Sequence, residues 1–212
     1  MGIVISAVLS AVYFLTIPWH PFAGSWVVKA ASVAILAALA ARKRARGLAV
    51  ALAFSALGDA LLEFSPELFI GGLAAFLLAH VTYTVTFVRR WQSARITPGA
   101  VVAACYSAGL AAWLLPEVGT IAIPVAVYVL AITAMVVSAF TARFPNRRVE
   151  AGAVLFLISD SMLAVDRFRM PVPLAEWIVW PTYYAAQLLI TTGYLNAVER
   201  DTAQPGAAAV RR

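Results

Sequence analysis

Long apolar runs separated by short polar or proline-containing segments dominate this chain. A membrane-spanning helix needs roughly 20 predominantly apolar residues, and a short one about 17. Eight runs are long enough, and prolines, glycines or charged residues mark the turns between them. They cover residues 2–17, 25–41, 47–64, 68–88, 97–115, 119–142, 149–166 and 174–197. The pattern predicts an all-α polytopic membrane protein with eight transmembrane helices.

Basic residues gather in every second predicted loop. Clusters of arginine and lysine follow the second, fourth, sixth and eighth runs, whereas the other loops contain only Arg167 and Arg169. Loops rich in basic residues stay on the cytoplasmic side of a membrane, so both termini are expected there. We expect one domain over residues 1–199. The polar, alanine-rich segment 200–212 is expected to be a disordered cytoplasmic tail.

The composition agrees with a membrane protein and excludes other classes. Hydrophobic residues make up 63% of the chain and charged residues only 12%, about half the share in soluble proteins. This excludes a soluble enzyme, a disordered chain and a nucleic-acid-binding domain. The net charge of +6 reflects the loop clusters, and the expected partner is the lipid bilayer. The abundance of arginine, alanine and valine favours a bacterial protein, and therefore the plasma membrane.

Two short segments indicate an internal repeat. Residues 58–62 read GDALL and residues 159–163 read SDSML, at an offset of 101 residues. Each is followed on the next run by a tyrosine, Tyr83 in the first half and Tyr183 in the second. Two parallel four-helix repeats, related by an axis along the membrane normal, would produce this pattern. Chance similarity between apolar helices is the alternative.

Several charged and polar residues interrupt the apolar runs. A charge at the centre of a span costs about 2.5–3.5 kcal/mol on insertion scales, so such residues face the interior of the bundle. At 1.5 Å per residue, Lys29, Asp59 and Asp160 fall in one layer in the outer half of the membrane. Glu63 lies one turn further out on the face of Asp59. A polar pocket open to the non-cytoplasmic side is expected, and its further candidate binding residues are His80, Tyr83, Ser161, Tyr183, Tyr184 and Gln187.

Each candidate also has a structural interpretation. Lys29 lies near a helix end, from which it can extend toward the interface. Glu63 is interfacial in this interpretation, and His80 is a hydrogen-bonded packing residue. Both aspartates have side chains too short to reach the interface, and their alternative role is a structural pair with Lys29. For the tyrosines and the glutamine of the eighth run, the alternative is bridging between helices.

Two carboxylates in one apolar environment favour acid–base chemistry. One can stay neutral and act as a general acid, while the other, ionised beside Lys29, acts as a base or stabilises a cation. A histidine-based zinc site is not expected, because His80 is the one histidine within a run. The single cysteine excludes a thiolate cage, and glycine-rich phosphate loops and a serine-hydrolase elbow are absent from the sequence. No cofactor or metal is expected.

Four segments of the chain together resemble the YhhN-like lysoplasmalogenase family of membrane proteins. They are FSALGDALLEF (54–64), FIGGLAAFLLAHVTYTVTF (69–87), GAVLFLISDSMLAVDRF (152–168) and TYYAAQLLI (182–190). The resemblance covers the second to the eighth run. It implies eight helices and hydrolysis of the vinyl-ether bond of lysoplasmalogens. The products would be a fatty aldehyde and a glycerophospho-alcohol, and the partner a lysophospholipid substrate.

The resemblance also implies roles for individual residues. The two key aspartates of the family fall on Asp59 and Asp160, and its buried lysine falls on Lys29. Family members often have a proline after this lysine, where Ala30 stands here. Hydrolysis would proceed by proton transfer to the β-carbon of the vinyl ether and addition of water to the resulting oxocarbenium ion. The aspartates would divide these roles, in an order that the sequence leaves open, with Lys29 near the phosphate or near one carboxyl.

Two other functions fit the same residues. A proton-coupled transporter or lipid-binding membrane protein would also need buried acids, a lysine and a repeat. Interrupted helices would favour that function, and the third and seventh runs contain no proline. The second alternative is a hydrolase of a different ether lipid or lysolipid. The sequence leaves the oligomeric state open.

Overall fold

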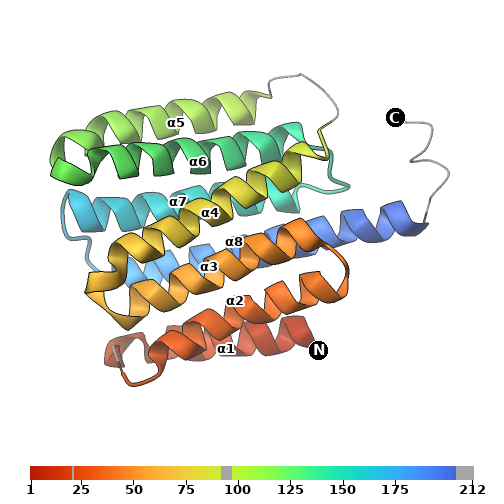
Figure 1. Cartoon of the computed structure of the whole chain (residues 1–212), viewed down its shortest axis with the longest axis horizontal. Helices are drawn as coiled ribbons and strands as arrows, with labels where there is room; N and C mark the ends of the chain where they lie inside the picture. Colours follow the sequence, from red (N-terminus) through yellow and green to blue (C-terminus); the bar gives the residue numbers. More distant parts are fainter. Residues whose placement is uncertain (21, 92–96, 204–212) are drawn as a thin grey trace.

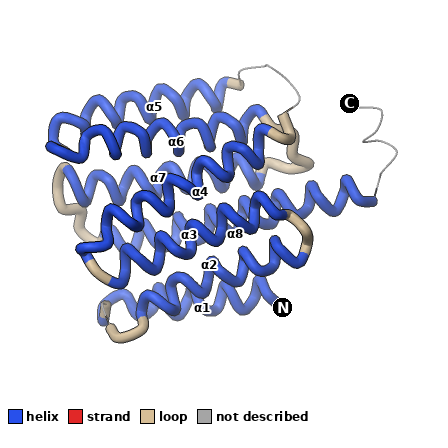
Figure 2. The backbone as a smooth tube through the Cα atoms, in the orientation of Figure 1, coloured by secondary structure: helices blue, strands red, loops and turns tan. Residues whose placement is uncertain are grey.

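A computed structural model of the chain describes residues 1–20, 22–91 and 97–203. These residues form eight α-helices and no β-strand, which confirms the predicted all-α class. The helices are α1 (Gly2–Thr16), α2 (Ser25–Arg42), α3 (Arg46–Phe64), α4 (Phe69–Val88), α5 (Pro98–Leu114), α6 (Ala122–Thr141), α7 (Arg148–Phe168) and α8 (Ala175–Ala203). Short loops join most of them (Figure 2). Their bounds follow the predicted runs closely except at the end of α8.

Successive helices run in opposite directions, so the start of α1 and the end of α8 lie at the same end of the bundle (Figure 1). The basic α2–α3 and α6–α7 loops lie at this end too. Helices α1 to α6 are long and apolar enough to cross a membrane by length and composition. Helices α7 and α8 are at least as long as most of these but more polar. A transmembrane position for them, and cytoplasmic termini, remain predictions.

Small residues bring two pairs of helices into close contact. In α3, a Cβ atom on Gly58 would meet the ring of Phe76 in α4 at 2.6 Å. In α7, a Cβ atom on Gly152 would meet the carbonyl oxygen of Ala186 in α8 at 2.8 Å. Glycine permits such close approach of helices, as is common in membrane proteins. The two halves are not equivalent, because α2 packs along α3 more extensively than α6 packs along α7. A duplicated origin therefore remains a prediction.

Helix α8 extends into the segment that we expected to be disordered. Residues 200–203 belong to its last turn, and residues 204–212 lie outside the described part of the chain. Two ion pairs hold this end of α8 against the bundle. Lys43 binds Glu199 at 3.1 Å, and Arg90 binds Asp201 at 2.7 Å. These contacts, which the local composition does not reveal, continue the helix past the predicted boundary.

Candidate active site

A polar cavity of about 300 Å³ opens inside the bundle, in the half away from the termini. Side chains from α1, α2, α3, α4, α6, α7 and α8 line it. Its charged residues come from α2, α3, α7 and the start of α8, and they are Asp59, Glu63, Asp160, Asp166, Glu176, Lys29 and Arg167. The structure thus brings Lys29 and both predicted aspartates to one cavity. Among the described residues, no group of three histidine, cysteine, aspartate or glutamate side chains is placed to hold a metal ion.

Asp59 is the more enclosed of the two aspartates, with 2% of its surface exposed. Its Oδ2 atom accepts a hydrogen bond of 2.7 Å from the Tyr183 hydroxyl on α8. The Tyr183 ring is held edge-on against Phe76 and Phe156, which fixes the direction of its hydroxyl. Gly58, directly before Asp59, leaves the room that Phe76 needs. Asp59 therefore accepts one side-chain hydrogen bond, from a tyrosine whose ring is held in place by packing.

Asp160 has two donors instead. Its Oδ2 atom accepts a hydrogen bond of 2.5 Å from the Tyr128 hydroxyl on α6 and lies 3.2 Å from His80 Nε2 on α4. Tyr128 and His80 also contact each other at 3.0 Å. The His80 ring is fully buried, and its Nδ1 atom has no partner among the described residues. A proton on Nε2 suits this geometry, because a bare ring nitrogen would repel the carboxylate.

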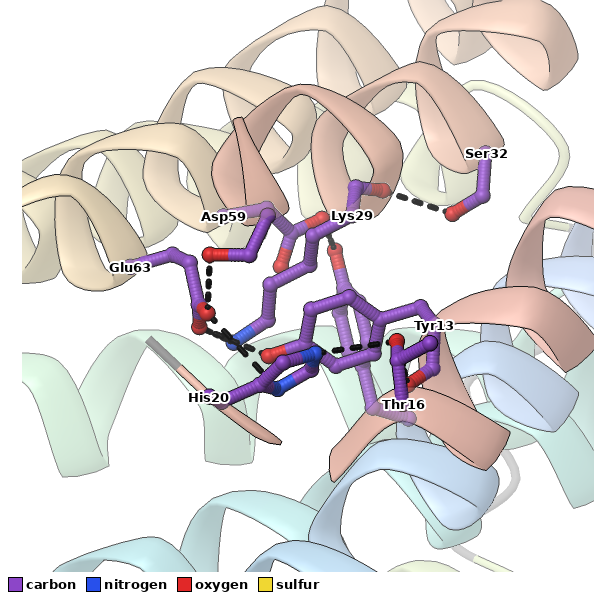
Figure 3. Close-up of polar contacts among 9 residues, drawn as sticks. Tyr13, Thr16, His20, Lys29, Ser32, Asp59 and Glu63 are labelled. Atoms are coloured by element: carbon purple, nitrogen blue, oxygen red, sulfur yellow. Dashed lines mark hydrogen bonds and ion pairs between the residues drawn. The ribbon is translucent and has the colours of Figure 1, made fainter. Parts of the chain in front are cut away.

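Glu63 is the centre of a second polar cluster, at the outer side of the cavity. Its Oε2 atom accepts hydrogen bonds from Tyr13 at 2.6 Å and Lys29 at 3.2 Å, and its Oε1 atom accepts one from Ser25 at 2.9 Å. Figure 3 shows Lys29 and Tyr13 directed at Glu63. The Lys29 ammonium also lies 5.1 Å from the centre of the Tyr13 ring. The positive charge of Lys29 is thus matched by Glu63.

The predicted pairing of Lys29 with an aspartate is therefore replaced by a pair with Glu63. Glu63 lies one turn beyond Asp59 on the same face of α3, and the long side chain of Lys29 reaches it from α2. His20 also approaches, with Nδ1 3.8 Å from Glu63 Oε1. Burial lowers the pKa of His20, so this loop imidazole is neutral at pH 7 and contributes no charge.

Five predicted binding residues, His80 among them, do not line the polar cavity. Ser161 faces a separate apolar cavity and donates its hydrogen bond to a backbone carbonyl one turn earlier in α7. The Tyr83 hydroxyl donates to Gln187 Oε1 at 2.6 Å and so connects α4 with α8. Tyr184 shares a hydrogen bond with a serine of α1. Tyr83, Tyr184 and Gln187 thus bridge helices, which for Tyr184 and Gln187 was the structural interpretation.

The sequence analysis missed Tyr128 and underrated Arg167. Tyr128 is the one tyrosine in a run without charged residues, and that position could have singled it out. The sequence analysis treated Arg167 and Arg169 alike, as the basic residues of the loop after the seventh run. Arg169 does pair with Glu117, but Arg167 lines the polar cavity, and its guanidinium lies 4.7 Å above the Phe69 ring. Arg167 forms no ion pair within the described part of the chain.

Comparison with known proteins identifies the family. Residues 24–194 match the YhhN family model. The chain belongs to the YhhN family. This matched region contains every site residue predicted from the sequence, whereas Tyr13 on α1 lies before it.

Curated relatives of this YhhN-family chain include bacterial and mammalian proteins. The lysoplasmalogenase of Mycobacterium bovis is 41% identical over 178 residues, which cover 77% of this chain and 68% of the relative. Human lysoplasmalogenase TMEM86B is 36% identical over 149 residues, covering 69% of this chain and 62% of the relative. Human lysoplasmalogenase TMEM86A is 34% identical over 175 residues, covering 76% and 69%. No solved structure matches the chain.

Proposed function

We propose that this chain is a membrane-embedded lysoplasmalogenase. It hydrolyses the vinyl-ether bond of a lysoplasmalogen to a fatty aldehyde and a glycerophospho-alcohol, in the plasma membrane of a bacterium. The names of its relatives support this activity. The observation that carries the proposal is that two aspartates with different hydrogen-bonding surroundings face one polar cavity inside an apolar bundle.

The surroundings of the two aspartates suggest their roles. Asp59 is the more buried and accepts one hydrogen bond, from Tyr183. Asp160 is more exposed and accepts from both Tyr128 and His80. Burial favours a neutral carboxyl, whereas additional donors favour a carboxylate. Asp59 is therefore the general acid, and Asp160 is the carboxylate that stabilises the cation and activates water.

These assignments give a balanced reaction. Asp59 transfers its proton to the β-carbon of the vinyl ether, and the oxocarbenium ion that forms faces the Asp160 carboxylate. Water adds to the α-carbon while Asp160 takes a proton from it, giving a hemiacetal. The hemiacetal then collapses to the aldehyde. Asp160 returns its proton to the departing glycerol oxygen and Asp59 recovers one from the hemiacetal hydroxyl, so both groups regain their starting states.

The phosphate of the substrate is assigned to Arg167. This guanidinium borders the polar cavity and forms no ion pair among the described residues, whereas Lys29 is already paired with Glu63. Arg167 follows Asp160 by seven residues on α7, which places both on one face of the helix. Guanidinium groups bind phosphate oxygens through two parallel hydrogen bonds. Of the two sequence-based alternatives for Lys29, this proposal sets aside the one that places it near the phosphate.

The test is aldehyde release by the purified protein in detergent from a 1-alkenyl lysophospholipid. Asp59→Asn and Asp160→Asn are expected to lose activity while keeping the thermal stability of the folded protein. Asp201→Asn, the same substitution at an exposed ion pair away from the cavity, is the matched control. In D₂O the aldehyde should carry one deuterium at C2, because the proposed acid protonates that carbon.

The opposite results are equally informative. Release of alcohol from a saturated alkyl-ether lysolipid would indicate a different hydrolase, since that bond cannot be protonated to an oxocarbenium ion in this way. Folded protein without any aldehyde product would contradict the proposal and favour transport. The unbroken course of α3 through Asp59 and of α7 through Asp160 is not what a transporter with interrupted helices requires.

A further inference from the structure

A narrow apolar cavity lies beside the polar one. Its volume is about 60 Å³, and it lies mainly between α4, α5, α6 and α7. Its walls are mainly hydrocarbon, and the apolar side chains that shape it include Leu73, Leu110, Leu114, Val125, Val129 and Ile132. We call this cavity the chain slot. A space this small and apolar suits a few carbons of a hydrocarbon chain and not a charged head group.

The chain slot and the polar cavity share a wall. Seven residues border both spaces, and Phe76, Tyr128, Asp160 and Arg167 are among them. Ser161, the next residue after Asp160, borders only the slot and directs its hydroxyl to a backbone carbonyl 2.6 Å away. The carboxylate of Asp160 therefore stands at the boundary between a polar and an apolar compartment.

We propose that the chain slot binds the carbons of the alkenyl chain next to the vinyl ether and selects an unbranched chain. This inference rests on the proposed function. In a lysoplasmalogen the vinyl ether is the junction between the polar glycerophospho group and the hydrocarbon. With the polar half in the cavity of Arg167 and the chain in the slot, that junction lies beside Asp160, where the reaction requires it.

Leu110 on α5 is a wall residue of the slot that suits a test of its size. It borders the slot but not the polar cavity, and it forms no part of the hydrogen-bonded groups around the aspartates. Each methylene that becomes buried against such a wall increases binding about fourfold. A larger side chain at Leu110 should exclude the chain, and a smaller one should admit a wider chain.

The first test compares two identical substitutions. Leu110→Trp fills the slot, whereas Leu130→Trp changes a side chain of α6 that is 71% exposed. With a hexadecenyl lysolipid, Leu110→Trp should lower kcat/KM at least tenfold, while a butenyl ether should lose much less. Leu130→Trp should leave the ratio between the two substrates as in the wild type. Equal ratios in all three proteins would overturn the chain slot.

A gain of function keeps the inference testable if Leu110→Trp does not fold. Leu110→Ala widens the slot, so it should accept a lysolipid with an isopropyl branch on the fourth chain carbon, which the wild type should reject by at least tenfold. If the wild type hydrolyses the branched and linear substrates equally, the slot does not select the chain.

A binding experiment separates this inference from the proposed function. The probe is a saturated alkyl-ether lysophospholipid with a diazirine on the fifth chain carbon, which the enzyme should not cleave. After irradiation, labelled peptides should come from Leu110, Val129 and Ile132. Labelling there without any aldehyde release from vinyl ethers would retain the slot and reject the proposed reaction. Aldehyde release with labelling spread over exposed side chains such as Leu130 would retain the proposed reaction and reject the slot.

Discussion

Asp59 and Asp160 occupy corresponding places on α3 and α7, but the helices around them supply different neighbours. Asp59 receives one hydrogen bond, from Tyr183 on α8. Asp160 receives hydrogen bonds from Tyr128 on α6 and from His80 on α4. Each aspartate is thus bonded by a helix from the other half of the chain, and the two helix environments differ in the number of donors.

The difference teaches that similar motifs can place carboxyl groups in different surroundings. Two aspartates with identical surroundings would compete for the same protonation state, and neither would be committed to acid or base. The two aspartates differ in burial and in the number of donors, as the proposed division of labour between acid and carboxylate requires. The small residue before each aspartate also differs. Gly58 makes room for Phe76, whereas Ser159 donates a hydrogen bond to a backbone carbonyl of α8.

The largest expected effects come from the aspartates themselves. Asp59→Asn removes the proposed proton donor and should lower kcat by up to about 10⁴-fold, whereas Asp160→Asn should lower it by about 10²-fold. Asp160→Ala should regain activity with added formate, which can enter the cavity and replace the carboxylate. Steady-state aldehyde release measures all three proteins. Formate rescue of Asp59→Ala instead of Asp160→Ala would reverse the two roles.

Replacing each tyrosine donor by phenylalanine tests how much each aspartate depends on its hydrogen bond. Tyr128→Phe removes a hydrogen bond to a charged carboxylate and should lower kcat by about 10- to 100-fold with little change in KM. Tyr183→Phe removes a hydrogen bond to a neutral carboxyl, so the loss should stay below about tenfold. Tyr106→Phe, on the exposed face of α5, is the control. A larger loss of kcat from Tyr183→Phe than from Tyr128→Phe would contradict the assignment.

The cations near the two aspartates differ as well. Lys29, on the side of Asp59, is paired with Glu63, whereas Arg167, on the side of Asp160, is available for phosphate. Arg167→Gln should raise KM about tenfold with kcat nearly unchanged. Arg169→Gln, two residues away and paired with Glu117, should not raise KM. If Lys29→Gln raised KM and Arg167→Gln did not, Lys29 would be the phosphate ligand.

The smallest effects concern the residues before the aspartates. A methyl group on Gly58 would lie 2.6 Å from the Phe76 ring, so Gly58→Ala should cost about 1–3 kcal/mol of stability. Ser159→Ala removes one neutral hydrogen bond and should cost about 0.5–1.5 kcal/mol. Gly109→Ala, whose new methyl group would meet no atom within 4 Å, is the control. Thermal unfolding in detergent ranks the stability of the three variants. Equal stability of Gly58→Ala and Gly109→Ala would show that α4 can shift away from α3 to accommodate the methyl group.

Much of the fold followed from the sequence because the membrane imposes simple rules. Apolar runs of sufficient length form helices, since the backbone must satisfy its own hydrogen bonds in lipid. The starts of α2, α3 and α7 could therefore be placed within one residue. The end of α8 could not, because its last turn depends on ion pairs from Arg90 and Lys43, which are distant in the sequence.

By itself, the sequence determined which runs form helices, and it predicted that Asp59, Asp160 and Lys29 share one layer, because helix rise converts residue number into depth. Depth says nothing about which helices are neighbours. Only the tertiary structure decided that Lys29 pairs with Glu63 and that Tyr128 and His80 both bond Asp160. These contacts depend on how each helix is rotated and which helices pack side by side, and that is determined by the close packing of side chains over the whole bundle.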